Sequence, residues 1–304
     1  MNISNVSLER MRTFVRVVER GNFSQVAREM EVAQPSVTRH MKELEEALNV
    51  SLLKRTTRQV SVTEEGERFY QRCVQILQLV EDASQEVQRK KSELKGRIHL
   101  SCTTAFGVQY LCPILHEFLA LHPEVELDIN LTDDRIDLIA EGVDFVIRLA
   151  PLANSSLKYR KLGDSERLLA ASPEFVAQYG PIDRPDDLAP LEAIRVCRVS
   201  DSKQVRLFKA EGGSVVLPLT GRFVIDNGLA AKDALVSGRG FGVTNRWLVQ
   251  DLLDSGKLVQ LLPDYTLEPI PLSLLIAPER ADITRVRYLI EYIVREVQKI
   301  PGIF

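Results

Sequence analysis

The spacing of apolar residues in the first fifty positions predicts three helices. Apolar side chains recur every three or four residues from Leu8 to Val18, and Gly21-Asn22 supplies a stop, so this stretch predicts an amphipathic helix. Ser24 is a suitable cap for a short second helix, and Gln34-Pro35 opens a third, at a position where the N–H that proline lacks costs nothing. The inward stripe of the third helix consists of Val37, Met41, Leu44 and Leu48. This succession is typical of a helix-turn-helix.

The third predicted helix carries amide, hydroxyl and basic side chains away from its apolar stripe. Glutamine pairs with adenine, arginine pairs with guanine, serine and threonine reach bases or phosphates, and the N-terminus of a helix itself favours phosphate. The candidate DNA contacts on this helix are Gln34, Ser36, Thr38, Arg39 and Lys42, with His40 as a further candidate beside Arg39. The pattern therefore predicts a recognition helix for the major groove.

Two short strands joined by a basic turn follow the third helix. Leu52 and Leu53 precede the run Lys54-Arg55-Thr56-Thr57-Arg58, and Val60-Ser61-Val62 alternates as a strand does. Such a wing lies against the phosphate backbone or enters the minor groove, and Arg55 and Arg58 are then its contacts. The alternative is a solvated hairpin tip, but the position of the turn after a helix-turn-helix favours the wing.

The ordered motifs of residues 21–66 resemble the LysR-type transcriptional regulators. The stretches that carry the resemblance are Gly21-Asn22-Phe23-Ser24-Gln25-Val26-Ala27, Gln34-Pro35-Ser36-Val37-Thr38-Arg39, Leu44-Glu45-Glu46-Ala47-Leu48, Arg55 and Thr63-Glu64-Glu65-Gly66. Departures occur at Ala33, Asn49 and Leu53, but asparagine tolerates the left-handed cap conformation that glycine supplies. The residues that the resemblance implies to lie near bases or backbone are Gln34, Pro35, Thr38 and Arg39, with Arg55 and Arg58 in the wing. We expect residues 1–62 to form a winged helix-turn-helix DNA-binding domain.

Residues 63–95 predict a long linker helix and a hinge. Thr63 is a suitable cap, and apolar residues spaced alternately by four and three positions form a coiled-coil seam. This apolar seam consists of Phe69, Cys73, Ile76, Val80, Ala83 and Val87. We favour a homodimer, which places two recognition helices on a two-fold symmetric site. The alternative is that the seam packs against the chain's own first helix or C-terminal domain.

From residue 96 onward short strands alternate with helices, which predicts an α/β domain. Strands at 97–101, 125–129 and 143–149 flank two helices, so this βαβαβ order implies a parallel sheet. A second set of the same kind follows, and a final helix over 283–298 would return to the first set. Two such lobes resemble the periplasmic-binding-protein-like effector domain of the same family. We expect lobe one at about 96–165 and 268–304, and lobe two at about 166–267.

The ends of the predicted strands supply candidate ligand contacts, because ligands bind beyond the carboxyl ends of parallel strands. In lobe one the hydroxyls of Thr103 and Thr104, with the N–H groups of the following helix, can hold a carboxylate, although plain helix capping is the alternative. Arg148 adds positive charge, unless it pairs with a structural acid such as Asp133 or Asp134. The full candidate set is Thr103, Thr104, Thr132, Asp133 and Arg148 from lobe one, with Ser200 and Asn227 from lobe two.

Composition and charge narrow the class of protein. The 304 residues are 45% apolar and carry a net charge of −3, yet residues 1–60 hold ten Lys or Arg against seven Asp or Glu, which agrees with DNA binding. No apolar run reaches the roughly 18 residues of a membrane span, and the first residues lack the layout of a secretory signal, so we expect a cytoplasmic protein. The four cysteines form no CxxC pair, which predicts neither a disulfide framework nor a metal site.

The sequence contains no GxSxG elbow, P-loop or HExxH motif, so we expect no catalytic residues and no cofactor. We predict a sequence-specific transcriptional regulator whose small-molecule effector, with a carboxylate as candidate class, binds between the lobes and shifts the population of dimer arrangements. The expected partners are double-stranded promoter DNA, the effector and RNA polymerase, and the resemblance implies a homotetramer. Three alternatives stay open: a constitutive architectural DNA-binding dimer, a small-molecule-binding protein whose N-terminal domain serves assembly, and a regulator that senses thiol oxidation or pH.

Overall fold

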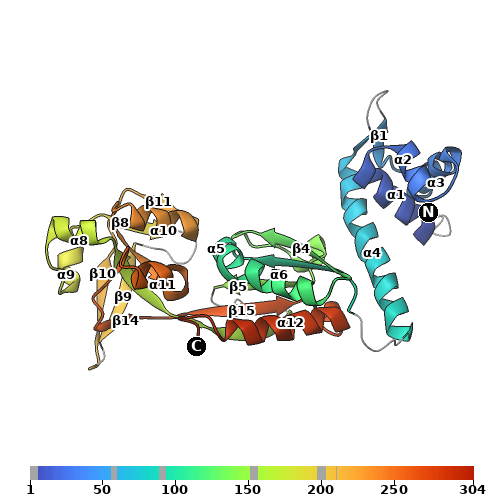
Figure 1. Ribbon diagram of the computed structural model, residues 1–304. Helices are drawn as coiled ribbons and strands as arrows, with labels where there is room; N and C mark the ends of the chain where they lie inside the picture. Colours follow the sequence, from blue (N-terminus) through green and yellow to red (C-terminus); the bar gives the residue numbers. More distant parts are fainter. Residues whose placement is uncertain (1–5, 56–59, 89–93, 151–156, 197–202, 210) are drawn as a thin grey trace. The chain divides into compact units, whose positions relative to one another are not determined.

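A computed structural model describes residues 6–55, 60–88, 94–150, 157–196, 203–209 and 211–304 (Figure 1). The chain divides into two compact units. The first comprises residues 1–92 with 140–142, and the second comprises residues 93–139 with 143–304. Each unit is described by itself.

The N-terminal unit contains the three predicted helices, the two short strands and the long helix. Its elements are α1 (Leu8–Arg20), α2 (Phe23–Glu29), α3 (Gln34–Leu48), β1 (Leu53–Arg55), β2 (Val60–Val62) and α4 (Glu64–Gln88). The cap of α2 differs from the expectation: the side chain of Asn22, not Ser24, accepts hydrogen bonds from the N–H groups of Ser24 and Gln25. Asparagine is as good a cap as serine, and it stands one residue before the helix, where its oxygen reaches both N–H groups.

Local chemistry fixes the ends of α3 and the start of α4. Asn49 ends α3 in the left-handed conformation at φ 54°. Asparagine tolerates this conformation, which glycine usually supplies at the end of a helix. The Thr63 side chain accepts a hydrogen bond from the N–H of Gly66 at 2.9 Å, so Thr63 caps α4 as predicted. Gly66 itself is required by close packing, because a Cβ there would stand 2.1 Å from the carbonyl oxygen of Leu52.

The core of this unit covers part of the apolar seam on α4. The rings of Phe14 on α1 and Phe69 on α4 lie 5.6 Å apart, and Cys73 is fully buried in the same core. Val80, one heptad beyond Cys73, is 38% exposed. The first half of the seam therefore packs on the chain's own helices, as the alternative interpretation held, and the side chains of Ala83 and Val87 lie outside the described part.

The second unit consists of two lobes, each built on a five-stranded sheet. Lobe one has the strand order β4-β3-β5-β15-β6, with β4 (Val125–Leu131), β3 (Gly96–Cys102), β5 (Phe145–Leu149), β15 (Ile270–Ile276) and β6 (Lys158–Ser165). Lobe two has the order β11-β8-β12-β7-β13, with β11 (Val224–Ile225), β8 (Ala193–Val196), β12 (Phe241–Asn245), β7 (Arg167–Ala171) and β13 (Val259–Leu261). A small sheet of lobe two contains β10 (Ser214–Pro218), β9 (Gln204–Lys209) and β14 (Tyr265–Leu267).

Helices cover both sheets, and the last helix returns to lobe one as expected, where α12 lies beside α6 (Figure 1, red and green). Lobe one carries α5 (Thr104–Phe106), the π-helical turn η2 (Gly107–Leu111), α6 (Cys112–Leu121), α7 (Leu138–Glu141), the 3₁₀ turn η3 (Pro278–Arg280) and α12 (Thr284–Val297). Lobe two carries α8 (Pro173–Tyr179), α9 (Pro185–Leu188), α10 (Gly228–Val236) and α11 (Arg246–Asp254).

The predicted strands β3, β4 and β5 pair in parallel, and one further strand in each main sheet runs antiparallel to its neighbours. In lobe one this strand is β15, which pairs antiparallel with both β5 and β6. In lobe two it is β7, which pairs antiparallel with β12 and β13. Both are the strands by which the chain enters a lobe from the other one. Because the parallel strands end at the side where the lobes meet, a strand that enters from that side must run the opposite way.

Candidate DNA-binding surface and ligand pocket

Helix α3 is divided into a buried face and an exposed face. Val37, Met41 and Leu44 are at most 1% exposed and pack in the core of the N-terminal unit. Among the predicted contacts, Gln34, Pro35, Arg39 and Lys42 are exposed, whereas Ser36 and Thr38 are half-buried. Among the described residues, the ion pairs of the two cations are long contacts along the helix, with Arg39 4.0 Å from Glu43 and Lys42 3.7 Å from Glu46. Such exposed pairs are weak and leave both cations available to a ligand.

His40 is only 8% exposed and faces α1, which argues against the predicted contact with DNA. Its Nδ1 lies 3.0 Å from the Thr13 hydroxyl, which already donates its proton to the carbonyl oxygen of Glu9. This contact joins α3 to α1 through two buried side chains. His40 therefore contributes to the packing of α3 against α1.

The predicted wing is present as an antiparallel pair in which Leu53 is opposite Val62. Lys54 is exposed on β1. Residues 56–59, which include Arg58, and the side chain of Arg55 lie outside the described part of the chain.

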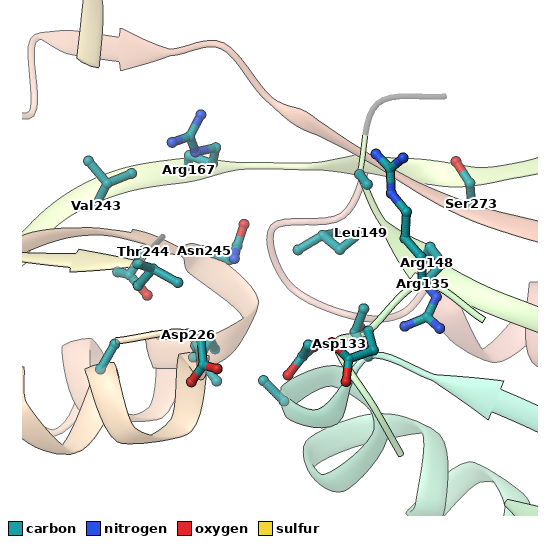
Figure 2. Close-up of a pocket in the computed structure, with 18 of the residues that line it drawn as sticks. Asp133, Arg135, Arg148, Leu149, Arg167, Asp226, Val243, Thr244, Asn245 and Ser273 are labelled. Carbon is teal, nitrogen blue, oxygen red and sulfur yellow. The ribbon is translucent and has the colours of Figure 1, made fainter. Parts of the chain in front are cut away.

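A cavity of about 370 Å³ lies between the lobes of the second unit. Figure 2 shows Arg167, Asp226 and the segment Val243–Asn245 on one side of it, and Asp133, Arg148 and Ser273 on the other. Three of the predicted contacts line it, namely Thr103, Asp133 and Arg148. Cavities of this size between lobes are typical sites for small organic ligands.

The other predicted contacts lie elsewhere or have a structural partner. The Thr132 hydroxyl accepts a hydrogen bond from the N–H of Asp134, and Asn227 caps α10 by accepting from the N–H groups of Leu229 and Ala230. Neither they nor Thr104 line the cavity. Ser200 lies outside the described residues.

The start of the helix after β3 is already occupied by a side chain of the protein. The N–H of Thr104 donates to Oδ1 of Asp133 at 3.2 Å, so the group that we expected to hold a ligand carboxylate holds Asp133 instead. Thr103 does not cap the helix with its side chain, and its buried hydroxyl oxygen has at most the Cys102 thiol as a partner among the described residues. Arg148 donates through Nη1 to the carbonyl oxygen of Thr132.

Several lining residues were not predicted from the sequence. Arg167 opens β7, where burial lowers its pKa and the charge of Glu268 offsets only part of that effect. Arg195, on β8, has a buried Nε with no hydrogen-bond partner among the described residues. A lone arginine within an apolar strand, as in Arg167-Leu168-Leu169 and Ile194-Arg195-Val196, is the signal that could have identified both.

Trp247, the single tryptophan of the chain, links the cavity to both lobes. Its Nε1 donates to the Ser165 hydroxyl at 2.9 Å, and Ser165 in turn donates to Oδ1 of Asn245 at 2.9 Å. Its carbonyl oxygen accepts hydrogen bonds from Gln109 and Tyr110 of lobe one, both at 3.0 Å. Because Asn245 and Trp247 both line the cavity, a ligand there contacts the residues that join the lobes.

Comparison with known proteins decides the family. The sequence profile of the LysR substrate binding domain matches residues 91–298, and that of the bacterial regulatory helix-turn-helix proteins of the lysR family matches residues 8–67. The chain belongs to the LysR family. It is a LysR-type transcriptional regulator with a helix-turn-helix DNA-binding segment and an effector-binding substrate domain, as the resemblance implied.

The LysR-type relatives align along nearly the whole chain. The transcriptional regulator DmlR of Escherichia coli K12 is 32% identical over 94% of this chain and 93% of its own length. The solved structure of CrgA, a LysR-type regulator from Neisseria meningitidis, is 29% identical with a TM-score of 0.62, and covers 95% of this chain and 98% of its own. The full-length structure of the Vibrio cholerae virulence activator AphB shares the fold at 24% identity, with a TM-score of 0.61 over 97% of this chain and 99% of its own.

The described helices include none that is both long and apolar enough to cross a membrane.

Proposed function

We propose that this LysR-type regulator reads promoter DNA with the exposed face of α3 and the β1–β2 wing, as a homodimer whose cavity between the lobes binds the effector. The observation that carries the proposal is the division of α3, whose apolar residues are buried while Gln34, Arg39 and Lys42 are exposed. Lys54 adds positive charge on the wing strand. These side chains donate hydrogen bonds, which phosphates and the edges of adenine and guanine accept.

The proposal assigns three regions to the chain: a DNA-binding domain at 1–62, a linker helix at 63–95 and an effector domain at 96–304. An effector that binds one arrangement of the dimer better than another shifts the population, and this changes how the protein engages promoter DNA and RNA polymerase in the cytoplasm. The homotetramer that the resemblance implies is a pair of such dimers.

The test is fluorescence anisotropy with the intergenic DNA beside the protein's own gene, over a series of salt concentrations. We expect specific binding that weakens steeply with salt and that Arg39→Ala weakens by about 1–3 kcal/mol, the value of a good base contact. The matched control is Arg72→Ala, which removes an exposed arginine of α4 that bonds to Gln75 on the same helix. Binding that depends on neither sequence nor Arg39 would refute the assignment of α3 and favour an assembly role for the N-terminal unit.

A further inference from the structure

The two walls of the cavity differ in how far their positive charge is neutralised. The lobe-one wall carries Arg135 and Arg148 together with Asp133 and Asp134. The lobe-two wall carries Arg167 and Arg195 together with Asp226. Among the described lining residues, lobe one therefore contributes no net charge and lobe two contributes one positive charge.

The two arginines of lobe two form few hydrogen bonds and ion pairs with the described part of the chain. Within the described part of the chain no carboxylate forms an ion pair with either within 4.0 Å. The hydrogen bond of Arg167 is a long one, from Nη1 to the carbonyl oxygen of Glu268 at 3.4 Å, and Nε of Arg195 is buried without a partner. A guanidinium has five N–H donors, and leaving a buried donor such as Nε of Arg195 unsatisfied is costly, so these residues suit an anion from outside the chain.

Lobe one offers a different kind of contact. The N–H of Thr104 is already used by Asp133, and Arg148 binds the carbonyl oxygen of Thr132. What remains is the Thr103 hydroxyl, whose buried oxygen has at most the weakly hydrogen-bonding thiol of Cys102 as a partner among the described residues. A hydroxyl of this kind pairs with a neutral ligand group such as a hydroxyl or carbonyl.

The space between these polar ends is apolar. It is lined by side chains from both lobes, among them Leu149, Val243 and Leu248. A cavity of about 370 Å³ that combines such apolar side chains with charged and polar ones is large enough for one small organic molecule.

We propose that the effector is an organic monocarboxylate whose carboxylate binds Arg167 and Arg195 of lobe two, whose body fills the apolar middle and whose far end faces Thr103. This orientation reverses the expectation that the carboxylate sits at the start of the helix after β3. It rests on the proposed function, in that the cavity is the effector site. The carboxylate would bind at β7, beside the point where the chain crosses between lobes, so its charge would act on the arrangement of the lobes.

The test uses the full chain and matched pairs of small acids and their amides, namely benzoate with benzamide, phenylacetate with phenylacetamide and hexanoate with hexanamide, at pH 8. Trp247 is the single tryptophan and lines the cavity, so its fluorescence reports binding there, and the melting temperature gives a second readout. We expect at least one acid to bind tenfold or more tightly than its amide. We expect Arg167→Gln and Arg195→Gln each to reduce this preference by about tenfold, which is the size of a charged hydrogen bond.

Two controls separate loss of the anion site from loss of the fold. Arg167→Lys keeps the charge but not the planar fork, and should retain part of the acid preference. Arg239→Gln removes an exposed arginine of lobe two outside the cavity and should leave the preference unchanged. The melting temperature of each variant without ligand reports its folding.

The outcomes distinguish this inference from the proposed function. Acids and amides that bind equally well would show an effector cavity without an anion site and would overturn the inference alone. Acid preference that survives both glutamine variants would place the carboxylate elsewhere and overturn it as well. If neither series changes the fluorescence or the melting temperature, the assignment of the cavity as the effector site fails, and the inference fails with it.

Discussion

At the scale of the residue, burial decides which cysteines can react. Burial raises the pKa of the Cys73 thiol and that of the Cys102 thiol to about 12. At pH 8 the reactive thiolate is then only about one part in ten thousand of each. We expect both thiols to resist iodoacetamide in the folded protein and to react after unfolding in urea, as measured by mass spectrometry of the labelled peptides. Rapid labelling of either thiol in the folded chain would contradict this and would revive thiol sensing as an alternative.

Residue types could be predicted from the sequence more readily than their partners. The stripe of Val37, Met41 and Leu44 follows from helical spacing, and the structure buries all three. His40 and Thr104 have suitable chemistry for DNA and ligand, yet Thr13 binds the first and Asp133 the second, each from a distant part of the sequence. Partners brought together by tertiary packing leave no local pattern, so sequence spacing alone could not exclude these two residues.

At the scale of the element, one glycine sets how closely α4 approaches the wing. A Cβ on Gly66 would lie 2.1 Å from the carbonyl oxygen of Leu52 and 2.8 Å from a methyl group of Val62. We expect Gly66→Ala to lower the free energy of unfolding by about 1–3 kcal/mol, the cost of overpacking a core, although alanine is the better helix former. Urea denaturation followed by circular dichroism measures it. A neutral result would show that β1 can move away from α4 at no cost.

The joint between β6 and α11 gives a second prediction at this scale. Ser165 is fully buried and is the hydrogen-bond partner of the Trp247 indole N–H. Ser165→Ala leaves that donor unsatisfied, so we expect a loss of about 1–3 kcal/mol in the unfolding free energy and a shift in tryptophan emission. Ser255→Ala, which removes an exposed hydroxyl bonded to the carbonyl oxygen of Leu252, should cost less. Equal stability of the two variants would show that water replaces the lost hydroxyl.

Strands and helices could be predicted where the apolar spacing was regular. The direction in which each strand runs in its sheet could not be predicted in the same way. The strand–helix alternation of 97–149 predicted β3, β4 and β5, and these pair in parallel. The reversed direction of β15 and β7 depends on the route of the chain between lobes, which no local pattern records. Strand β9 was missed although its residues alternate between exposed and buried positions, so that signal was readable in the sequence.

At the scale of the whole molecule, the burial of α4 limits which of its apolar residues can contact a second copy of the chain. Cys73 is fully buried in the core of the chain's own N-terminal unit, and Phe69 and Ile76 pack against that core but stay partly exposed. The exposed apolar side chains of α4 include Leu79, at 46%, and Val80, at 38%. We therefore expect the proposed dimer contact to be centred on the second half of the helix. A dimer interface centred there would be shorter than the seam that the apolar spacing predicted. A single charge would then disturb a larger share of it.

A charge placed on that half of α4 tests the dimer. We expect Val80→Glu to shift the chain toward monomer in light scattering coupled to gel filtration, because the carboxylate would lose its water on association. Gln71→Glu adds the same charge at an exposed position on the first half of the helix, and should leave the dimer intact. Affinity for the promoter DNA should fall with Val80→Glu but not with Gln71→Glu, since a monomer engages one half-site where a dimer engages two. If Val80→Glu remains dimeric, the dimer contact must lie elsewhere on the chain, and the DNA affinity would then be unchanged as well.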